Sequence, residues 1–426
     1  MKNKAFYRDY VNILENELVP AMGCTEPISL AYGAAYCRSV LGEEPKQILA
    51  ECSGNIVKNV RCVIIPHSGG MAGIETAVVL GALGGDHKKE LEVLTTVKPC
   101  HIEEAKAFIE SRRCFVKLLD SNIPLHFIIT MEGDRNTAIV EIGESHTNIV
   151  RVEKNGEILL KKDFEGYSED INYDALNLDD IKAFADGVDL DDVRELLDRQ
   201  IEYNMAICRE GFKGEYGVGI GNIIKNSYPD QVITRMKSMA SSGSEARMGG
   251  CEFPVIVNSG SGNQGITASV PVIVYAETMG LSQEVLYRGL VFSNLLTVYQ
   301  KMYIGKLSAF CGVVSAGCAA GAAITYMLDG SVERIQKTIE NTLANIPGII
   351  CDGAKVSCAA KIATSIDAAY LAHRMAMNDA VYIANTGIIQ KTTSKTISCV
   401  GTIGKDGMRE TDREILKIIL DSDEEE

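Results

Sequence analysis

Four of the 13 cysteines lie beside glycine or a turn rather than within a run of large apolar residues. They are Cys24 in AMGCTEP, Cys311 in SAFCG, and Cys351 and Cys358 in ICDGAKVSCAAK. An isolated cysteine is commonly a small buried hydrophobe. When several cysteines lie on glycine-flanked turns, a metal ligand or a reactive thiol is about as good an interpretation as a buried hydrophobe. None of the four has the C-x-x-C spacing of structural zinc sites or common iron–sulfur motifs, so spacing alone names no metal.

One histidine and two glycine-rich loops are further candidates for a site. His67 ends the apolar run of IIPHSGG and opens a glycine turn. Such a place can display an active-site base, and a turn histidine bonded to the backbone is an equally good interpretation. The loops are Ser68–Gly73 and Asn258–Gly265, whose backbone N–H groups can approach a small ligand closely. The second loop suits a carboxylate held at the start of a helix.

Composition and charge exclude several classes of protein. A chain of 426 residues that is 46% hydrophobic is neither disordered nor collagen-like. The net charge of −15 argues against nucleic acid as the principal partner. Residues 310–328 carry no charge but are rich in Ala, Gly, Ser and Cys, which favours a buried helix over a membrane span. No secretory signal is visible, so we expect a cytoplasmic protein, with a homodimer as the default assembly.

Hydrophobic patterns predict where helices and strands lie. Residues 4–40 read as two helices with a break at Gly23, and Ala-rich helical patterns return from about residue 175. Between them, short β-branched runs alternate with turn signals around one helix at residues 101–113. The first of these runs, LEVLTTV at residues 91–97, is predicted as a strand.

These patterns predict an α+β fold. We expect a mainly helical catalytic domain built from residues 1–90 and 170–426. A small α+β domain of residues 91–169 would be inserted into it.

Several segments together resemble a known family. They are GCTEP at Gly23–Pro27, NIVKNV, IIPHSGGMAG, SGSGNQG at Ser259–Gly265, and ICDGAK at Ile350–Lys355. They resemble L-cysteine desulfidase and its uncharacterised relatives over nearly the whole chain. More distantly, the chain is similar to the α chain of iron–sulfur L-serine dehydratases, which implies a serine-dehydratase-like catalytic domain.

The resemblance implies a [4Fe–4S] cluster held by three thiolates, with one iron left open. It points to Cys311 and Cys351 as ligands. The desulfidase pattern suggests Cys24 as the third ligand, whereas the dehydratase pattern suggests Cys358.

The implied reaction is β-elimination from a small L-amino acid, in which L-cysteine gives pyruvate, ammonia and sulfide. GCTEP replaces the serine- and histidine-rich motif of the dehydratases, which argues against serine as the preferred substrate. Thr25, Ser68 and Asn263 are the expected carboxylate contacts, and His67, followed by Lys355, is the expected base. The alternatives are an L-serine dehydratase of the same cluster type, a pyridoxal-phosphate lyase, and a non-catalytic amino-acid- or metal-binding protein.

Overall fold

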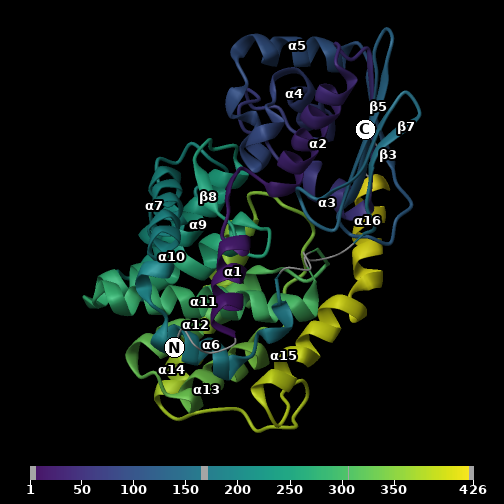
Figure 1. The fold of residues 1–426 in the computed structure, drawn as a ribbon. Coiled ribbons are helices and arrows are strands. Elements are labelled where there is room, and N and C mark those ends of the chain that lie inside the picture. Colours follow the sequence, from purple (N-terminus) through teal and green to yellow (C-terminus); the bar gives the residue numbers. More distant parts are fainter. Residues whose placement is uncertain (1–5, 165–170, 306, 422–426) are drawn as a thin grey trace.

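The computed structural model describes residues 6–164, 171–305 and 307–421 and is mainly helical with one larger sheet (Figure 1). The predicted α+β fold class is confirmed. One lobe carries the sheet and a few helices, and the other lobe is a bundle of helices.

The lobe with the sheet is formed by the chain from α2 to β7. Three helices and the 3-10 helix η1 pack together and against the sheet, while α3 lies at the edge nearer the other lobe. The elements are α2 Thr25–Leu41, β2 Gln47–Cys52, α3 Gly54–Val60, α4 Ile74–Gly84, η1 His87–Thr96, α5 Pro99–Glu110, β3 Cys114–Leu118, β4 His126–Glu132, β5 Thr137–Gly143, β6 Ile149–Lys154 and β7 Glu157–Lys161.

The sheet has the strand order β3-β2-β4-β5-β6-β7. Only the β2–β3 pair is parallel, and the remaining neighbours are antiparallel. Strand β2 comes from before residue 91, so the sheet extends across the predicted start of the inserted domain. The other predicted boundary, at residues 169 and 170, lies outside the described residues. The division into 1–90 with 170–426 and 91–169 stays a prediction.

The strand predicted at residues 91–97 is wrong, because this segment belongs to the 3-10 helix η1. Leu91, Val93 and Leu94 are buried there, and η1 packs against α2. Asp86 begins the element by accepting a hydrogen bond from the N–H of Lys88. Helical geometry is interrupted within η1 at Glu90 and Glu92, and the buried side chains of the element pack against α2 without a strand partner.

The second lobe contains the remaining helices and short elements. They are α1 Phe6–Glu17, η2 Tyr173–Ala175, α6 Leu178–Gly187, η3 Leu190–Asp192, α7 Arg194–Gly211, α8 Ile220–Ser227, α9 Val232–Met248, α10 Gly262–Met279, α11 Gln283–Ile304, α12 Val313–Leu328, α13 Val332–Asn345, α14 Cys358–Met377, α15 Thr393–Thr402, η4 Ile403–Gly407 and α16 Arg409–Asp421. Small residues let these helices pack closely: a Cβ at Gly317 of α12 would lie 3.0 Å from Ser365 of α14.

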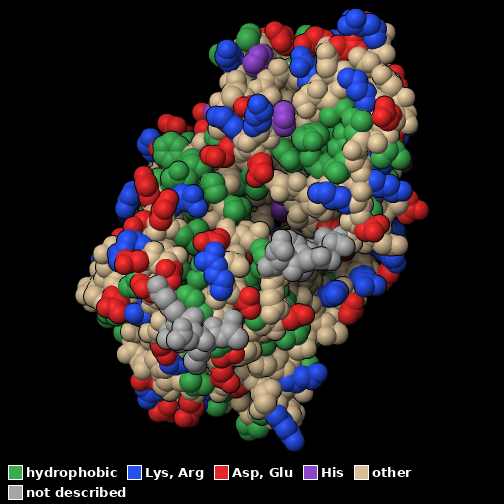
Figure 2. All heavy atoms as spheres, in the orientation of Figure 1, with side chains coloured by type: hydrophobic (Ala, Val, Ile, Leu, Met, Phe, Trp, Pro, Cys, Tyr) green, Lys and Arg blue, Asp and Glu red, His purple; other side chains and the backbone are tan. Residues whose placement is uncertain are grey.

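The uncharged segment at residues 310–328 is confirmed as a buried helix, α12. In the described parts of the chain, no helix combines the length and apolar character that a membrane crossing requires. On the face shown in Figure 2, basic and acidic side chains are interspersed.

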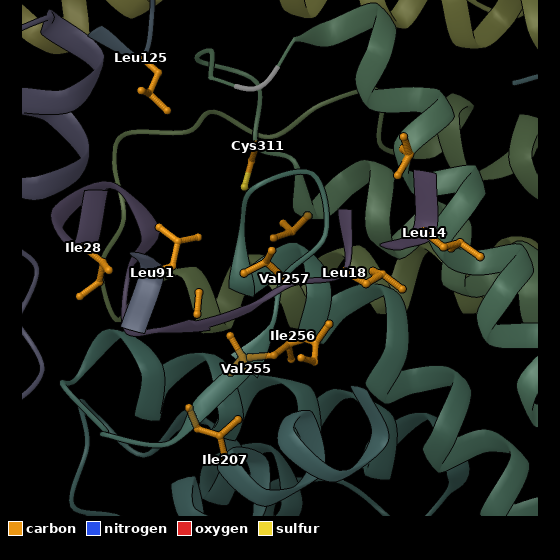
Figure 3. Packing of buried hydrophobic residues seen from close by; sticks show 14 of the residues in the cluster. Leu14, Leu18, Ile28, Leu91, Leu125, Ile207, Val255, Ile256, Val257 and Cys311 are labelled. Carbon is orange, nitrogen blue, oxygen red and sulfur yellow. The ribbon is translucent and has the colours of Figure 1, made fainter. Parts of the chain in front are cut away.

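Two connections join the lobes. Strand β1 (Pro20–Met22) pairs with strand β8 (Pro254–Ile256), and each of the two strands is followed by a glycine-containing segment. The C-terminal helix α16 leaves the helical lobe and packs on α3 of the sheet-bearing lobe (Figure 1). The buried core continues between these elements, and Figure 3 shows Cys311 among its side chains.

Candidate active site

Two loops of the helical lobe bring Cys311 and Cys351 together. Residues 309–311, before α12, run antiparallel to residues 349–351, before α14. The N–H of Cys311 donates to a carbonyl of the opposite segment at 2.8 Å, and the N–H of Cys351 donates likewise at 2.7 Å. Both cysteines flank the bridged pair, so their side chains leave this short ladder on the same face.

Cys358 completes a group of three thiols. It is the first residue of α14, and its side chain is buried. Its N–H donates to the carbonyl of Lys355 at 2.9 Å, a turn that directs the chain from Cys351 into the helix. The sulfur of Cys358 lies close enough to those of Cys311 and Cys351 for their charges to interact. The structure therefore brings together three of the four predicted ligands.

The thiols differ in acidity because of their contacts. A hydrogen bond from the Cys311 thiol, reinforced by the ammonium groups of Lys58 and Lys361, lowers the pKa of Cys351 to about 6. The same hydrogen bond, together with burial, raises the pKa of Cys311 well above its ordinary value. Burial also raises the pKa of Cys358. Metal binding would displace the protons of these thiols, because the thiolate is the form that binds a metal.

Three lysines that the sequence reasoning missed surround the thiols. Lys301 of α11 is 5% exposed, and burial lowers its pKa to about 8. Lys361 of α14 donates to the carbonyl of Ile350 at 2.9 Å and pairs with Asp352. Lys58 of α3 is buried and reaches the site from the other lobe. A signal for Lys301 was available, because it follows twelve uncharged residues, 289–300.

Cys24 lies against the same loop but has a different partner. It packs with Val63 and Met248 and with partly buried apolar side chains at residues 354 and 356. Its thiol donates to a carboxylate oxygen of Glu26 at 3.0 Å. Burial and the charge of Glu26 raise the pKa of Cys24 well above its ordinary value. Cys24 is therefore held by Glu26, next to the loop that carries residues 354 and 356.

Three of the segments that carry the family resemblance meet around Cys24. Gly23 has a φ of +56°, and a Cβ there would lie 2.4 Å from the ring of Pro66, so GCTEP packs directly on IIPHSGG. Thr25 donates to the carbonyl of Gly260 at 2.8 Å, which ties GCTEP to SGSGNQG. Asn263, in the first turn of α10, accepts a hydrogen bond from Ser244 at 3.1 Å.

His67 contacts a distant segment of the chain, whereas Ser68 and Lys355 bond within their own loops. His67 has a φ of +57°, and its Nδ1 lies 3.1 Å from a carboxylate oxygen of Glu252. Ser68 donates to the carbonyl of Met71 at 2.9 Å, which closes the glycine turn. Lys355 lies between two of the thiols in sequence and pairs with Asp352. His67 and Lys355 stay predictions for the base, and Ser68 stays a prediction for substrate contact.

The donor set suits an iron–sulfur cluster better than a single ion. Within residues 6–164, 171–305 and 307–421, no three His, Cys, Asp or Glu side chains are placed around one metal ion. A cluster makes a different demand, because each thiolate binds a separate iron. Three neighbouring thiols, one already acidic, with lysines that offset negative charge, fit a cluster with one open iron.

Comparisons with known proteins show the family of this chain. The family model for the serine dehydratase alpha chain matches residues 88–417. A UPF0597 protein of Lachnoclostridium phytofermentans is 46% identical, covering 97% of this chain and all of that protein. A UPF0597 protein of Desulfitobacterium hafniense is 47% identical, covering 97% of this chain and 97% of that protein. A UPF0597 protein of Treponema denticola is 44% identical, covering 98% of this chain and 99% of that protein. The chain therefore belongs to the serine dehydratase alpha chain family.

Proposed function

We propose that this protein is an iron–sulfur-dependent lyase that converts L-cysteine to pyruvate, ammonia and sulfide. The observation that carries the proposal is the group of three neighbouring thiols, Cys311, Cys351 and Cys358, one of which has a pKa of about 6. Membership of the serine dehydratase alpha chain family supports the reaction class. We assign these three residues as the cluster ligands and leave Cys24, which is bonded to Glu26, outside the ligand set.

The roles of the protein's own residues follow from their positions. A bound [4Fe–4S] cluster supplies an iron with an open coordination position, which is a Lewis acid. The ammonium groups of Lys58, Lys301 and Lys361 offset the negative charge that three thiolates bring into the interior. Loss of the Cα proton and of the β-sulfur, as hydrosulfide, leaves an enamine, and water converts this to pyruvate and ammonia.

Iron content tests the ligand assignment directly. Protein purified without oxygen should contain iron and acid-labile sulfide, and Cys311→Ala, Cys351→Ala and Cys358→Ala should each lose most of both. Cys24→Ala should keep its iron, since its thiol bonds to Glu26. Cys318→Ala is a matched control, because Cys318 is also buried and lies on α12, close in sequence to Cys311. Equal iron content in all five variants would refute the assignment.

The family model favours one second candidate, L-serine dehydration by the same site. Both reactions release pyruvate, so a pyruvate assay with L-cysteine and L-serine side by side separates them. A higher kcat/KM for L-cysteine supports the desulfidase, and a higher value for L-serine supports the dehydratase. Absence of pyruvate from both substrates, in protein that holds its full iron and sulfide, would contradict the lyase proposal.

A further inference from the structure

A buried arginine lies beside the three-thiol group without an anionic partner. Arg247, near the end of α9, is 2% exposed. Its Nε makes no hydrogen bond, and the hydrogen-bond contact found for its Nη1 is the sulfur of Met248 at 4.0 Å. In the described residues, no carboxylate lies within ion-pair distance of it. A buried guanidinium without a partner is costly, so a site that keeps one is arranged to receive an anion.

The nearby carboxylates are already occupied. Glu245, two residues earlier on α9, accepts hydrogen bonds from three successive N–H groups at residues 218–220, at 2.5, 2.9 and 2.7 Å. These donors form the GVGIG loop that begins α8, so that loop holds an internal carboxylate. Glu26 accepts from Cys24 at 3.0 Å, Thr25 at 3.1 Å and Asn59 at 3.1 Å. Neither carboxylate pairs with Arg247, although Glu26 is close enough for their charges to interact.

The N-terminus of α10 points at the same place. A Cβ at Gly262, the first residue of α10, would lie 2.3 Å from Nε of Arg247, so only glycine leaves room for the guanidinium there. The N-cap residue Ser261 makes no side-chain cap hydrogen bond. α10 is 18 residues long and largely buried, and the free N–H groups of its first turn carry partial positive charge. A side-chain cation and a helix N-terminus therefore converge on one small volume.

The same helical turn reaches the thiols. A Cβ at Gly312, next to Cys311, would lie 2.5 Å from the amide carbon of Gln264. Gln264 is buried, and its Oε1 has no hydrogen-bond partner. The first turn of α10 thus contacts Arg247 through Gly262 and the Cys311 loop through Gln264.

We propose that Arg247 and the N-terminal turn of α10 bind the α-carboxylate of an amino-acid substrate. The inference rests on the proposed lyase function and adds the residues that orient the substrate. The guanidinium and the N–H groups of the turn supply the positive charge and the donors that a carboxylate requires.

Binding of two probes tests the proposal without turnover. L-alanine has the carboxylate but no leaving group, and L-alaninamide has the same shape without the negative charge. Calorimetry on the anaerobically purified full chain should show L-alanine binding at least about tenfold more tightly (~1.4 kcal/mol). Arg247→Gln should weaken L-alanine binding by about tenfold or more and remove the preference, and Arg247→Lys should keep part of it. Arg235→Gln is the matched control on α9, where Arg235 is exposed and paired with Asp230.

Stability separates a binding role from a structural one. Without ligand, Arg247→Met should unfold at the same temperature as the wild type or higher, because it removes an unpaired buried charge. An arginine needed for folding would give a lower temperature.

Two results would overturn the proposal: no wild-type preference for L-alanine over L-alaninamide, or a preference that survives in Arg247→Gln. A different result would contradict the proposed lyase reaction. If the protein prefers L-alanine through Arg247 but makes no pyruvate, the carboxylate site is supported and the lyase function is contradicted.

Discussion

Replacing Lys301 with methionine should stabilise the cluster-free protein at neutral pH. Lys301 is buried at the end of α11, and its ammonium group has no carboxylate within ion-pair distance in the described chain. Burial lowers its pKa from 10.5 to about 8, and the nearby Cys311 and Cys351 sulfurs oppose this change only in part. At pH 7 the folded protein therefore keeps a charge that its interior disfavours.

The magnitude follows from that pKa. Each tenfold change in a protonation constant corresponds to about 1.4 kcal/mol, so the fall from 10.5 to about 8 costs the folded state about 3 kcal/mol. The unfolded chain holds this proton up to about pH 10.5, whereas the folded protein releases it near pH 8. Stability therefore rises with pH between these values, and the cost is complete below pH 8. Methionine fills a similar volume without the charge.

Urea unfolding of chelator-treated, reduced protein measures this effect. Lys301→Met should be more stable than the wild type by about 3 kcal/mol at pH 7, and the difference should shrink toward pH 10.5. Lys395→Met on α15 is the control, because Lys395 is exposed. Lys301→Met should retain less iron than the wild type, because the variant lacks a cation beside two proposed ligands. A variant less stable than the wild type at pH 7, or a difference constant from pH 7 to 10.5, would refute this reasoning.

Two further predictions concern other parts of the fold. Burial lowers the pKa of His373, which bonds to Thr325 at 2.9 Å, to about 4. The unfolded chain takes up the proton at a higher pH than the folded protein, so the free energy of unfolding of the wild type should fall by up to about 3 kcal/mol between pH 6.5 and 4. In urea unfolding, His373→Asn should show a smaller fall over this range. An unchanged pH dependence in the variant would contradict the prediction. Asp412→Asn removes the partner of the buried Lys58 and should cost about 3 kcal/mol and speed hydrogen exchange in α16. Lys58→Met in the same chain should restore part of the stability, and unaltered exchange would argue against α16 being held by this pair.

The sequence located much of the fold from local patterns. Buried helices such as α12 and the β4–β7 strands follow hydrophobic periodicity, which depends on neighbouring residues alone. The prediction failed at residues 91–97, where β-branched residues favoured a strand but packing against α2 produced η1. Strand β2 pairs with β3 and β4, which are distant in sequence, so its partners could not be identified from the local pattern.

Some features of the candidate site were visible in the sequence, and others required the tertiary structure. Glycine beside cysteine at a break in the pattern marked Cys311 and Cys351, because such positions show in the sequence itself. Nothing in the local pattern separates Cys24 from Cys358 as the third ligand. In the tertiary structure Cys358 interacts electrostatically with the other two thiols and Cys24 donates to Glu26, which is why we propose Cys358.

The sequence by itself determined the residue types: which cysteines could serve as ligands, and that a glycine-rich loop begins α10. Only the tertiary structure decided which charges are buried and which have partners. Glu245 accepts hydrogen bonds at the start of α8, Arg247 has no carboxylate within ion-pair distance among the described residues, and Lys301 is buried because α11 packs within the helical lobe. Burial and pairing are set by segments far apart in the chain, and the free energy of a charge depends on both.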